Sequence, residues 1–294
     1  MASPVTVTHI SDPCCPWAYS ASPALSVLHW RFGDQLDWRL VLIGLAETPE
    51  RYERSGYTPA RSAAGYRRFH RFGMPFGGQP RERLTATGRA CRTVVAARLA
   101  EPALELPVFR ALQLSQFTGT ELLDTDEGLR AALARLNGGV DADALVGALG
   151  DDAVEEAYQS DRARARTAQG SPTEAQGRAA DTDGAVRYTA PSLHFAHADG
   201  RTIEAGGFQP LEAYDTCLAN LDATLERRPP ATDPLDVLRA LPYAPTTREV
   251  AACMAPHLTE PDDAATETAL ITAAGEGLVR REAIGNGALW HLAA

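Results

Sequence analysis

The chain of 294 residues contains no lysine, so all 28 of its basic residues are arginines. Its 38 acidic residues give a net charge of −10, which disfavours nucleic acid as a partner because phosphate binding requires concentrated positive charge. Long apolar runs are also missing. No stretch approaches the roughly 20 residues of a membrane span, and no basic segment followed by an apolar one opens the chain. We therefore expect a cytoplasmic protein without a membrane partner.

Cysteine is scarce and irregularly spaced. The chain has five cysteines, an odd number without paired spacing. This argues against a secreted disulfide framework and predicts reduced thiols. No C-x-x-C metal knuckle is present, and His194 and His197 should lie on opposite faces of a strand, so we expect no bound metal. The five cysteines are Cys14, Cys15, Cys91, Cys217 and Cys253.

The segment 12–19, with the sequence DPCCPWAY, is the main candidate for chemistry. An apolar strand over 5–10 should deliver Cys15 to the first turn of a helix, which Pro16 is well suited to begin. Unpaired amide N–H groups at a helix start favour an anion. We therefore expect the pKa of Cys15 to lie below the roughly 8.5 of a free cysteine and its thiolate to act as a nucleophile. Tyr19, one turn further on, is expected in the core.

The spacing C-P-W-A over 15–18, after an Asp-Pro pair, resembles the DsbA-like branch of the thioredoxin superfamily, in particular its FrnE-like and 2-hydroxychromene-2-carboxylate isomerase-like members. In the dithiol members the position of Ala18 holds a second cysteine, which resolves mixed disulfides. Cys14 is a poor substitute, because adjacent Cα atoms are closer together than those of an ordinary disulfide. The resemblance implies that Cys15 is the catalytic residue and that Pro16, Trp17 and Ala18 contact the substrate.

A second part of the resemblance lies at 188–195, with the sequence YTAPSLHF, which is typical of a strand entered through a proline. It resembles the cis-proline loop of thioredoxin-like folds, and this implies that Ala190 and Pro191 contact the substrate. An ordinary trans proline at a strand start is the alternative. A turn at 199–200, a strand over 202–204 and a helix over 211–221 match the closing hairpin and helix of that family.

Between these two parts the pattern is almost entirely helical. After a second strand over 36–45, the apolar spacing predicts helices over 87–100, 107–117, 125–136, 141–149 and 151–169. We expect an α/β chain with a thioredoxin-like fold formed by 1–48 and 181–228, interrupted by a large all-helical insertion, or lid, over 49–180.

The segment 67–78, RRFHRFGMPFGG, combines cationic and aromatic groups with glycines. Its arginines can grip a carboxylate, and on this basis His70 and Arg71 are candidate substrate-binding residues. The alternative is a solvated basic helix end followed by a loop whose aromatic rings pack into the core.

The C-terminal part begins after a proline-rich linker over 229–234. Helices over 235–241, 247–254 and 262–274, followed by a hairpin, make 235–294 resemble a small α+β winged-helix domain. Its third helix carries acidic residues and no basic one, which argues against DNA binding. We expect a structural or dimer-forming role, with a homodimer as the corresponding partner.

Three functions are open at this point. A monothiol oxidoreductase would form a mixed disulfide at Cys15 with a disulfide substrate, which glutathione or mycothiol would resolve. An isomerase or transferase would use such a thiol, or Cys15 itself, to add to a small electrophile. The family resemblance favours the first, whereas Ala18 and the helical lid favour the second. A non-catalytic binding scaffold is the third. No covalently bound cofactor is expected.

Overall fold

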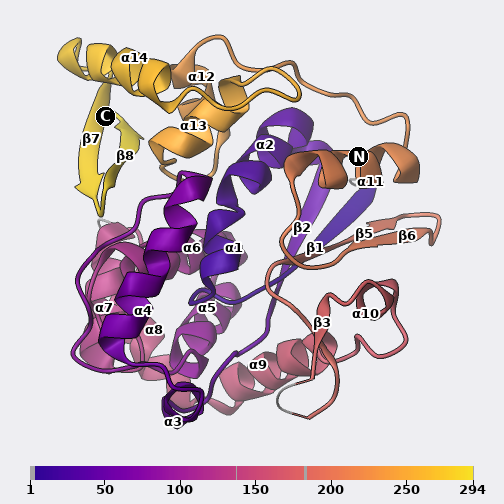
Figure 1. Ribbon diagram of the computed structural model, residues 1–294, viewed down its shortest axis with the longest axis vertical. Helices are drawn as coiled ribbons and strands as arrows, with labels where there is room; N and C mark the ends of the chain where they lie inside the picture. Colours follow the sequence, from indigo (N-terminus) through magenta and orange to yellow (C-terminus); the bar gives the residue numbers. More distant parts are fainter. Residues whose placement is uncertain (1–3, 137, 182–183, 294) are drawn as a thin grey trace.

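The computed structural model describes residues 4–136, 138–181 and 184–293, so the predicted domain ends at 1 and 294 lie outside it. At its centre is a four-stranded sheet in the order β2-β1-β5-β6 (Figure 1). Strand β1 runs parallel to β2 and antiparallel to β5, which in turn pairs antiparallel with β6. The strands are β1 (Val5–Ser11), β2 (Leu36–Leu42), β5 (Ser192–His197) and β6 (Thr202–Ala205).

Helices α1 (Pro16–Ser20), α2 (Ser22–Phe32) and α11 (Leu211–Leu221) complete the thioredoxin-like part. Alternation along β1 turns Val5 and Val7 to one face, where they share an apolar core with residues of α2 and α11. Ile10 faces the other side and packs with Tyr188 of the segment before β5. The predicted strands and closing helix are confirmed, although β2 ends three residues early.

The insertion is helical, as its periodicity predicts, and all five predicted helices are present. The one predicted over 107–117 is longer at both ends, and the other four are shorter. Buried Asp161 connects it to the sheet, because its carboxylate accepts the Leu42 amide at 3.1 Å and pairs with Arg98 at 2.6 Å. A 3₁₀ helix covers Arg67–Phe72. The helices are α3 (Glu50–Arg54), α4 (Pro59–Tyr66), α5 (Gly88–Ala100), α6 (Glu105–Thr118), α7 (Asp126–Leu133), α8 (Ala142–Gly147), α9 (Asp152–Ala165) and α10 (Pro172–Ala175). A short pair of strands, β3 (Ala179–Ala180) and β4 (Arg187–Tyr188), leads back to the sheet.

Three helices and a hairpin follow, in the predicted order. They are α12 (Pro234–Ala240), α13 (Thr247–Met254), α14 (Asp263–Gly275), β7 (Val279–Ile284) and β8 (Gly287–Leu292). The designation of this part as a winged helix stays a prediction. Val27 and Trp30 of α2 lie in the same apolar core as Trp290 of β8, so this part is packed directly on the thioredoxin-like part.

The hairpin turn of the C-terminal part contacts the insertion. The side-chain oxygen of Asn286 accepts the Phe76 backbone amide at 2.8 Å. The backbone amide of Asn286 donates to the Phe76 carbonyl at 3.1 Å. A Cβ on Gly285, whose φ is +48°, would lie 2.7 Å from the Phe76 backbone, so this close approach requires glycine. Within the described residues, no helix has both the length and the apolar character needed to cross a membrane.

Candidate active site

Cys15 lies at the point where the chain leaves β1 and enters α1. Its backbone is extended, with φ −87° and ψ 116°, and Pro16 occupies the first turn of the helix as predicted. The Cys15 amide donates to the Asp12 carbonyl at 3.1 Å, which closes the turn. The side chain is 6% exposed and lies in an apolar cluster with Ala18 and Ala190.

The loop that contains Ala190 and Pro191, which we call the proline loop, contacts Cys15. The Ala190–Pro191 peptide bond is cis, which confirms the prediction made from the resemblance. The Cys15 thiol donates to the Ala190 carbonyl at a Sγ–O distance of 3.4 Å, although 175 residues separate the two in sequence. The fold therefore brings together six of the predicted site residues: Cys15, Pro16, Trp17, Ala18, Ala190 and Pro191.

The protonation of Cys15 differs from the prediction. Burial raises the pKa of the Cys15 thiol to about 11, although the Ala18 and Trp17 amides act to lower it. The prediction of a lowered pKa is therefore wrong for this structure, because desolvation of the thiolate outweighs the effect of the helix start. Burial also raises the pKa of Cys14 far above that of a free thiol. In this conformation the site holds a protonated Cys15.

Asp12 is an anchor of the loop that the sequence analysis did not single out. Fully buried, its carboxylate accepts the Cys14 and Leu45 amides, each at 2.8 Å, and the Thr87 hydroxyl at 3.0 Å. The Cys91 thiol approaches the same carboxylate at 3.6 Å. Burial raises the pKa of Asp12 in spite of these donors. The Asp-Pro pair before the cysteines was the available signal, because an aspartate there can bond the backbone two residues on.

Trp17 is held by aromatic rings. Its ring centroid lies 4.9 Å from that of Phe69, 5.9 Å from that of Phe72 and 5.4 Å from that of Phe208. Two of these rings come from the 3₁₀ helix over Arg67–Phe72, which is therefore part of the wall beside α1. Tyr19 is in the core as predicted, and its hydroxyl donates to the Pro75 carbonyl at 2.9 Å.

The structure places His70 and Arg71 on the exposed side of that 3₁₀ helix. The His70 ring lies 5.9 Å from Phe76, and the Arg71 guanidinium lies 4.8 Å above the Phe72 ring. Neither residue is among those that line the cavity described next, so their predicted contact with substrate gains no support from it. The alternative, a solvated basic surface with buried aromatic rings, describes this segment.

Other arginines surround a cavity of about 320 Å³ beside the cysteine loop, which we call the arginine pocket. Cys14 and Pro16 form part of its wall, and three tyrosines, Tyr52, Tyr57 and Tyr66, give it an aromatic lining. Among the described residues that line it there is no Asp or Glu, although the chain as a whole is strongly acidic. Its four cationic residues are Arg61, Arg68, Arg81 and Arg83.

The positive charge of this pocket is mostly unneutralised. Arg83 pairs with Asp124 through contacts of 2.6 and 2.8 Å. In contrast, Arg61 donates to the Gly56 carbonyl at 2.7 Å, and Arg81 donates to the carbonyls of Glu121 and Gln116. Arg68 lies 4.9 Å above the Phe69 ring. Within the described residues, none of these last three arginines has a carboxylate partner, so the pocket is suited to an anion.

Metal-binding groups are dispersed. His194 packs against Tyr188 at 4.3 Å, whereas His197 pairs with Asp199 at 2.9 Å. No group of three or more His, Cys, Asp or Glu side chains with the geometry of a metal site occurs in the part of the chain that the structure describes.

Several solved structures have a similar fold. A provisionally assigned protein disulfide isomerase from Nitrosomonas europaea is 20% identical, with a TM-score of 0.54, over 74% of this chain and 96% of that one. The cytosolic disulfide reductase DsbM from Pseudomonas aeruginosa is 20% identical, with a TM-score of 0.51, over 75% and 98% of the two chains. The chain has the DsbA-like thioredoxin fold.

A second structure of DsbM, with GSH, is 21% identical over the same shares of the two chains, with a TM-score of 0.50. At these identities the likeness establishes the fold and leaves the chemistry to the residues of the site. No protein-family model matches the chain, and no curated protein matches it.

Proposed function

We propose that this protein is a thiol-dependent oxidoreductase that uses Cys15 alone for exchange with a disulfide of an anionic low-molecular-weight thiol. The observation that supports this most strongly is the position of the Cys15 thiol, at a helix start and 3.4 Å from the carbonyl before a cis proline. The structure of DsbM with GSH makes glutathione a reasonable first thiol to test, with mycothiol as the alternative.

The exchange needs no second cysteine in the chain. The Cys15 thiolate attacks one sulfur of a disulfide R–S–S–R, forming a mixed disulfide with Cys15 and releasing R–S⁻, which takes up a proton. A second small thiolate, R′–S⁻, then attacks the R sulfur of the mixed disulfide. This step forms R–S–S–R′ and returns Cys15, which is reprotonated. Ala18, in place of a resolving cysteine, is consistent with this cycle.

The Ala190 carbonyl has a part in the activation of Cys15. In the structure this carbonyl accepts a hydrogen bond from the Cys15 thiol, which favours the protonated state of Cys15. A substrate N–H that binds the same carbonyl displaces this hydrogen bond. The thiolate then faces the amides of Trp17 and Ala18, which lower its pKa. Cys15 is in this way unreactive at rest and becomes reactive when a substrate occupies the proline loop.

The arginine pocket supplies the site for the anionic part of the thiol. Its wall includes Cys14 and Pro16, the two neighbours of Cys15 in sequence, whereas Cys15 itself does not line it. A thiol bound there therefore has to extend its sulfur beyond the pocket wall to reach Cys15. Carboxylates bind arginine strongly because the guanidinium presents two parallel donors. Arg68 is the most available of the four, because its one described contact is with the Phe69 ring.

A bound-thiol isomerase or transferase is the second candidate, and the burial of Cys15 favours it. A thiol with a pKa of about 11 is mostly protonated at neutral pH, so the bound small thiol would then be the nucleophile and Cys15 would orient it. In this alternative the substrate is a small electrophile covered by the helical insertion. The scaffold role, the cytoplasmic location, the winged-helix identity of 235–294 and a homodimer formed through it stay predictions.

Replacement of Cys15 tests the proposal. We expect Cys15→Ser to abolish the reduction of a glutathione-linked peptide disulfide by reduced glutathione, and Cys14→Ser to retain it. Circular dichroism and thermal unfolding check that both variants fold. Retained activity in Cys15→Ser would contradict exchange at this residue and favour the bound-thiol alternative. Inactivity of the wild-type protein with every disulfide and electrophile tested would favour a scaffold.

A further inference from the structure

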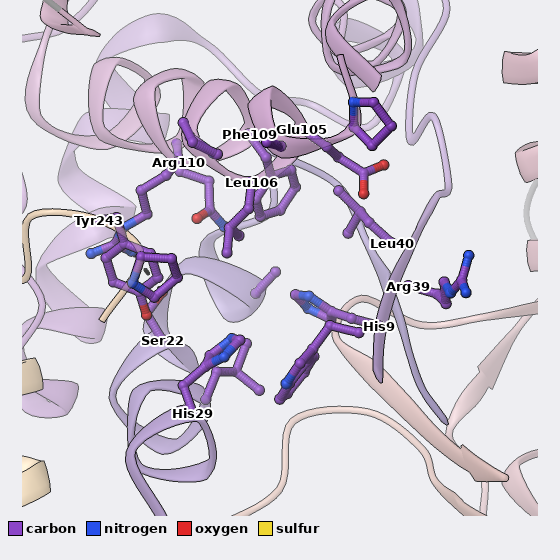
Figure 2. A pocket seen from close by; sticks show the side chains of 18 residues that line it. His9, Ser22, His29, Arg39, Leu40, Glu105, Leu106, Phe109, Arg110 and Tyr243 are labelled. Atoms are coloured by element: carbon purple, nitrogen blue, oxygen red, sulfur yellow. Dashed lines mark hydrogen bonds between the residues drawn. The ribbon is translucent and has the colours of Figure 1, made fainter. Parts of the chain in front are cut away.

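A second cavity, which we call the β1–α6 cavity, is distinct from the arginine pocket and reaches the C-P-W-A segment only at Ala18. Figure 2 shows the side chains that line it. It has a volume of about 380 Å³ and shares no lining residue with the arginine pocket. Its walls come from β1, β2, α1, α2, the segment 102–103, α6 and the segment 242–243 of the C-terminal part. All three parts of the chain therefore contribute to it, and its volume is in the range of small-molecule sites.

The walls are mainly apolar and aromatic. Leu40, Leu106 and Phe109 border the space in Figure 2. The His9 ring lies below Leu40 in that view and packs edge-on against the Phe109 ring, at a centroid distance of 6.0 Å. The His29 ring stacks on Trp38 at a centroid distance of 4.4 Å and an interplanar angle of 23°. Such walls favour a flat, apolar ligand.

The charged groups at this cavity are already paired. Arg110 forms an ion pair with Glu249 and donates to the Ser22 hydroxyl at 3.0 Å. Glu105 pairs with Arg98 and Arg39 with Asp37. Burial lowers the pKa of His9 to about 3 and that of His29 to about 4, so both rings are neutral at physiological pH. An ion that entered would lose its hydration without gaining a counter-charge.

Three polar side chains at the cavity have a group without a partner among the described residues. Gln113 is 2% exposed, and its amide forms no hydrogen bond with any residue that the structure describes. His9 is 7% exposed, and its Nε2 atom has no hydrogen-bond partner among those residues. The indole N–H of Trp38 is likewise unpartnered within the described chain. Buried polar groups are normally paired. The two ring nitrogens are enclosed by the protein and do not face the open cavity, whereas the Gln113 amide is not enclosed, so Gln113 is the group that indicates a missing partner there.

We propose that the β1–α6 cavity binds an uncharged aromatic small molecule that carries a hydroxyl group, with the hydroxyl held by the Gln113 amide. An amide offers both a donor and an acceptor, which matches a hydroxyl group. The apolar body of the molecule lies between Leu106, Phe109 and the His29–Trp38 stack. The binding proposed here does not rest on the chemistry proposed for Cys15, although Ala18, which packs in one cluster with Cys15, also lines this cavity.

The test compares three probes of one shape: 4-ethylphenol, ethylbenzene and 4-ethylbenzoate, titrated against the full chain by saturation-transfer NMR. We expect saturable binding of 4-ethylphenol, with an affinity about five- to tenfold higher than that of ethylbenzene, because one hydrogen bond is added. 4-Ethylbenzoate should not compete with 4-ethylphenol, since this cavity excludes charge. No saturable binding of 4-ethylphenol, or equal affinity for ethylbenzene, would overturn the proposal.

Variants locate the site. Leu106→Trp, or Leu40→Phe should the first fail to fold, fills the cavity and should abolish the binding of both neutral probes. Ala63→Leu, at the arginine pocket, is the matched control and should change neither. Gln113→Leu should weaken 4-ethylphenol about five- to tenfold and leave ethylbenzene unchanged. Binding that persists after the cavity is filled would place the site elsewhere and refute the assignment.

Thermal unfolding separates ligand binding from a structural role of Gln113. An amide without a partner contributes nothing to stability, so Gln113→Leu should unfold at the same temperature as the wild-type protein or at a higher one. A lower unfolding temperature would show that the amide has a structural partner and would contradict its assignment to a ligand.

Discussion

At the scale of single residues, two opposing effects act on the sulfur of Cys15. The amides of Ala18 and Trp17 favour the thiolate, whereas burial and the charge of Asp12 disfavour it. Burial is the largest of these effects and raises the pKa to about 11. The resting protein therefore protects its thiol, and reactivity depends on what occupies the proline loop.

The pH dependence of alkylation tests this balance. The thiolate is the species that reacts with iodoacetamide, and its fraction rises as the pH approaches the pKa. We expect the rate at Cys15 in the resting protein to keep increasing beyond pH 9.5, toward a midpoint near 11. Peptide mass spectrometry assigns the rate to Cys15, with Cys15→Ser as the control. A plateau below about pH 8.5 would restore the original prediction of an activated thiolate.

At the scale of elements, the 3₁₀ helix over Arg67–Phe72 has two similar arginines with different surroundings. Arg68 and Arg71 each lie over the ring of the following phenylalanine, at 4.9 and 4.8 Å. Arg68 lines the arginine pocket, whereas Arg71 does not. Comparison of Arg68 with Arg71 therefore distinguishes the effect of a pocket arginine from that of a surface arginine of the same helix.

Substitution of these two arginines tests the pocket. Arg68→Gln should raise the KM for glutathione about tenfold and leave kcat unchanged, because a charge-assisted contact to the bound anion is lost. Arg71→Gln should leave both constants unchanged. The reverse pattern would support the prediction made from sequence, that Arg71 contacts the substrate, and would move the binding site to the outer face of this helix.

Sequence reasoning was most successful for structural features that depend on residues close together in the sequence. Pro16 at the start of α1 and the apolar periods of the insertion helices depend on neighbouring residues, and the structure confirms them. The cis bond at Pro191 came from the family resemblance. The pKa of Cys15 and the lining of the arginine pocket depend on segments far apart in the chain. Arg61 and Arg81 meet at that pocket only after the insertion has folded, so local pattern could not identify them.

At the scale of the whole molecule, a buried ion pair connects the insertion to the C-terminal part. Arg110 of α6 is 6% exposed and Glu249 of α13 is fully buried, and their side chains form an ion pair. Glu249 also closes the start of α13, by accepting the Thr246 amide at 2.8 Å and its hydroxyl at 2.9 Å. Ser26 of α2 donates to the same carboxylate at 3.2 Å. One carboxylate therefore connects all three parts of the chain.

Removal of the negative charge of Glu249 should destabilise the protein. We expect Glu249→Gln to lower the free energy of unfolding by about 3–5 kcal/mol, because a buried guanidinium is left without a counter-charge. Urea denaturation measures this change. Asp236→Asn, which breaks the exposed pair with Arg239, is the control and should cost less than about 1 kcal/mol. Equal, small effects of both substitutions would show that the C-terminal part does not depend on the buried pair.

The most direct test of the central claim is to incubate the protein with oxidised glutathione, block the remaining thiols and locate the mixed disulfide by peptide mass spectrometry. The proposed chemistry predicts glutathione on Cys15, removed by excess reduced glutathione, with Cys14, Cys91, Cys217 and Cys253 unmodified. An unmodified Cys15, or glutathione on Cys14 in its place, would contradict exchange at Cys15.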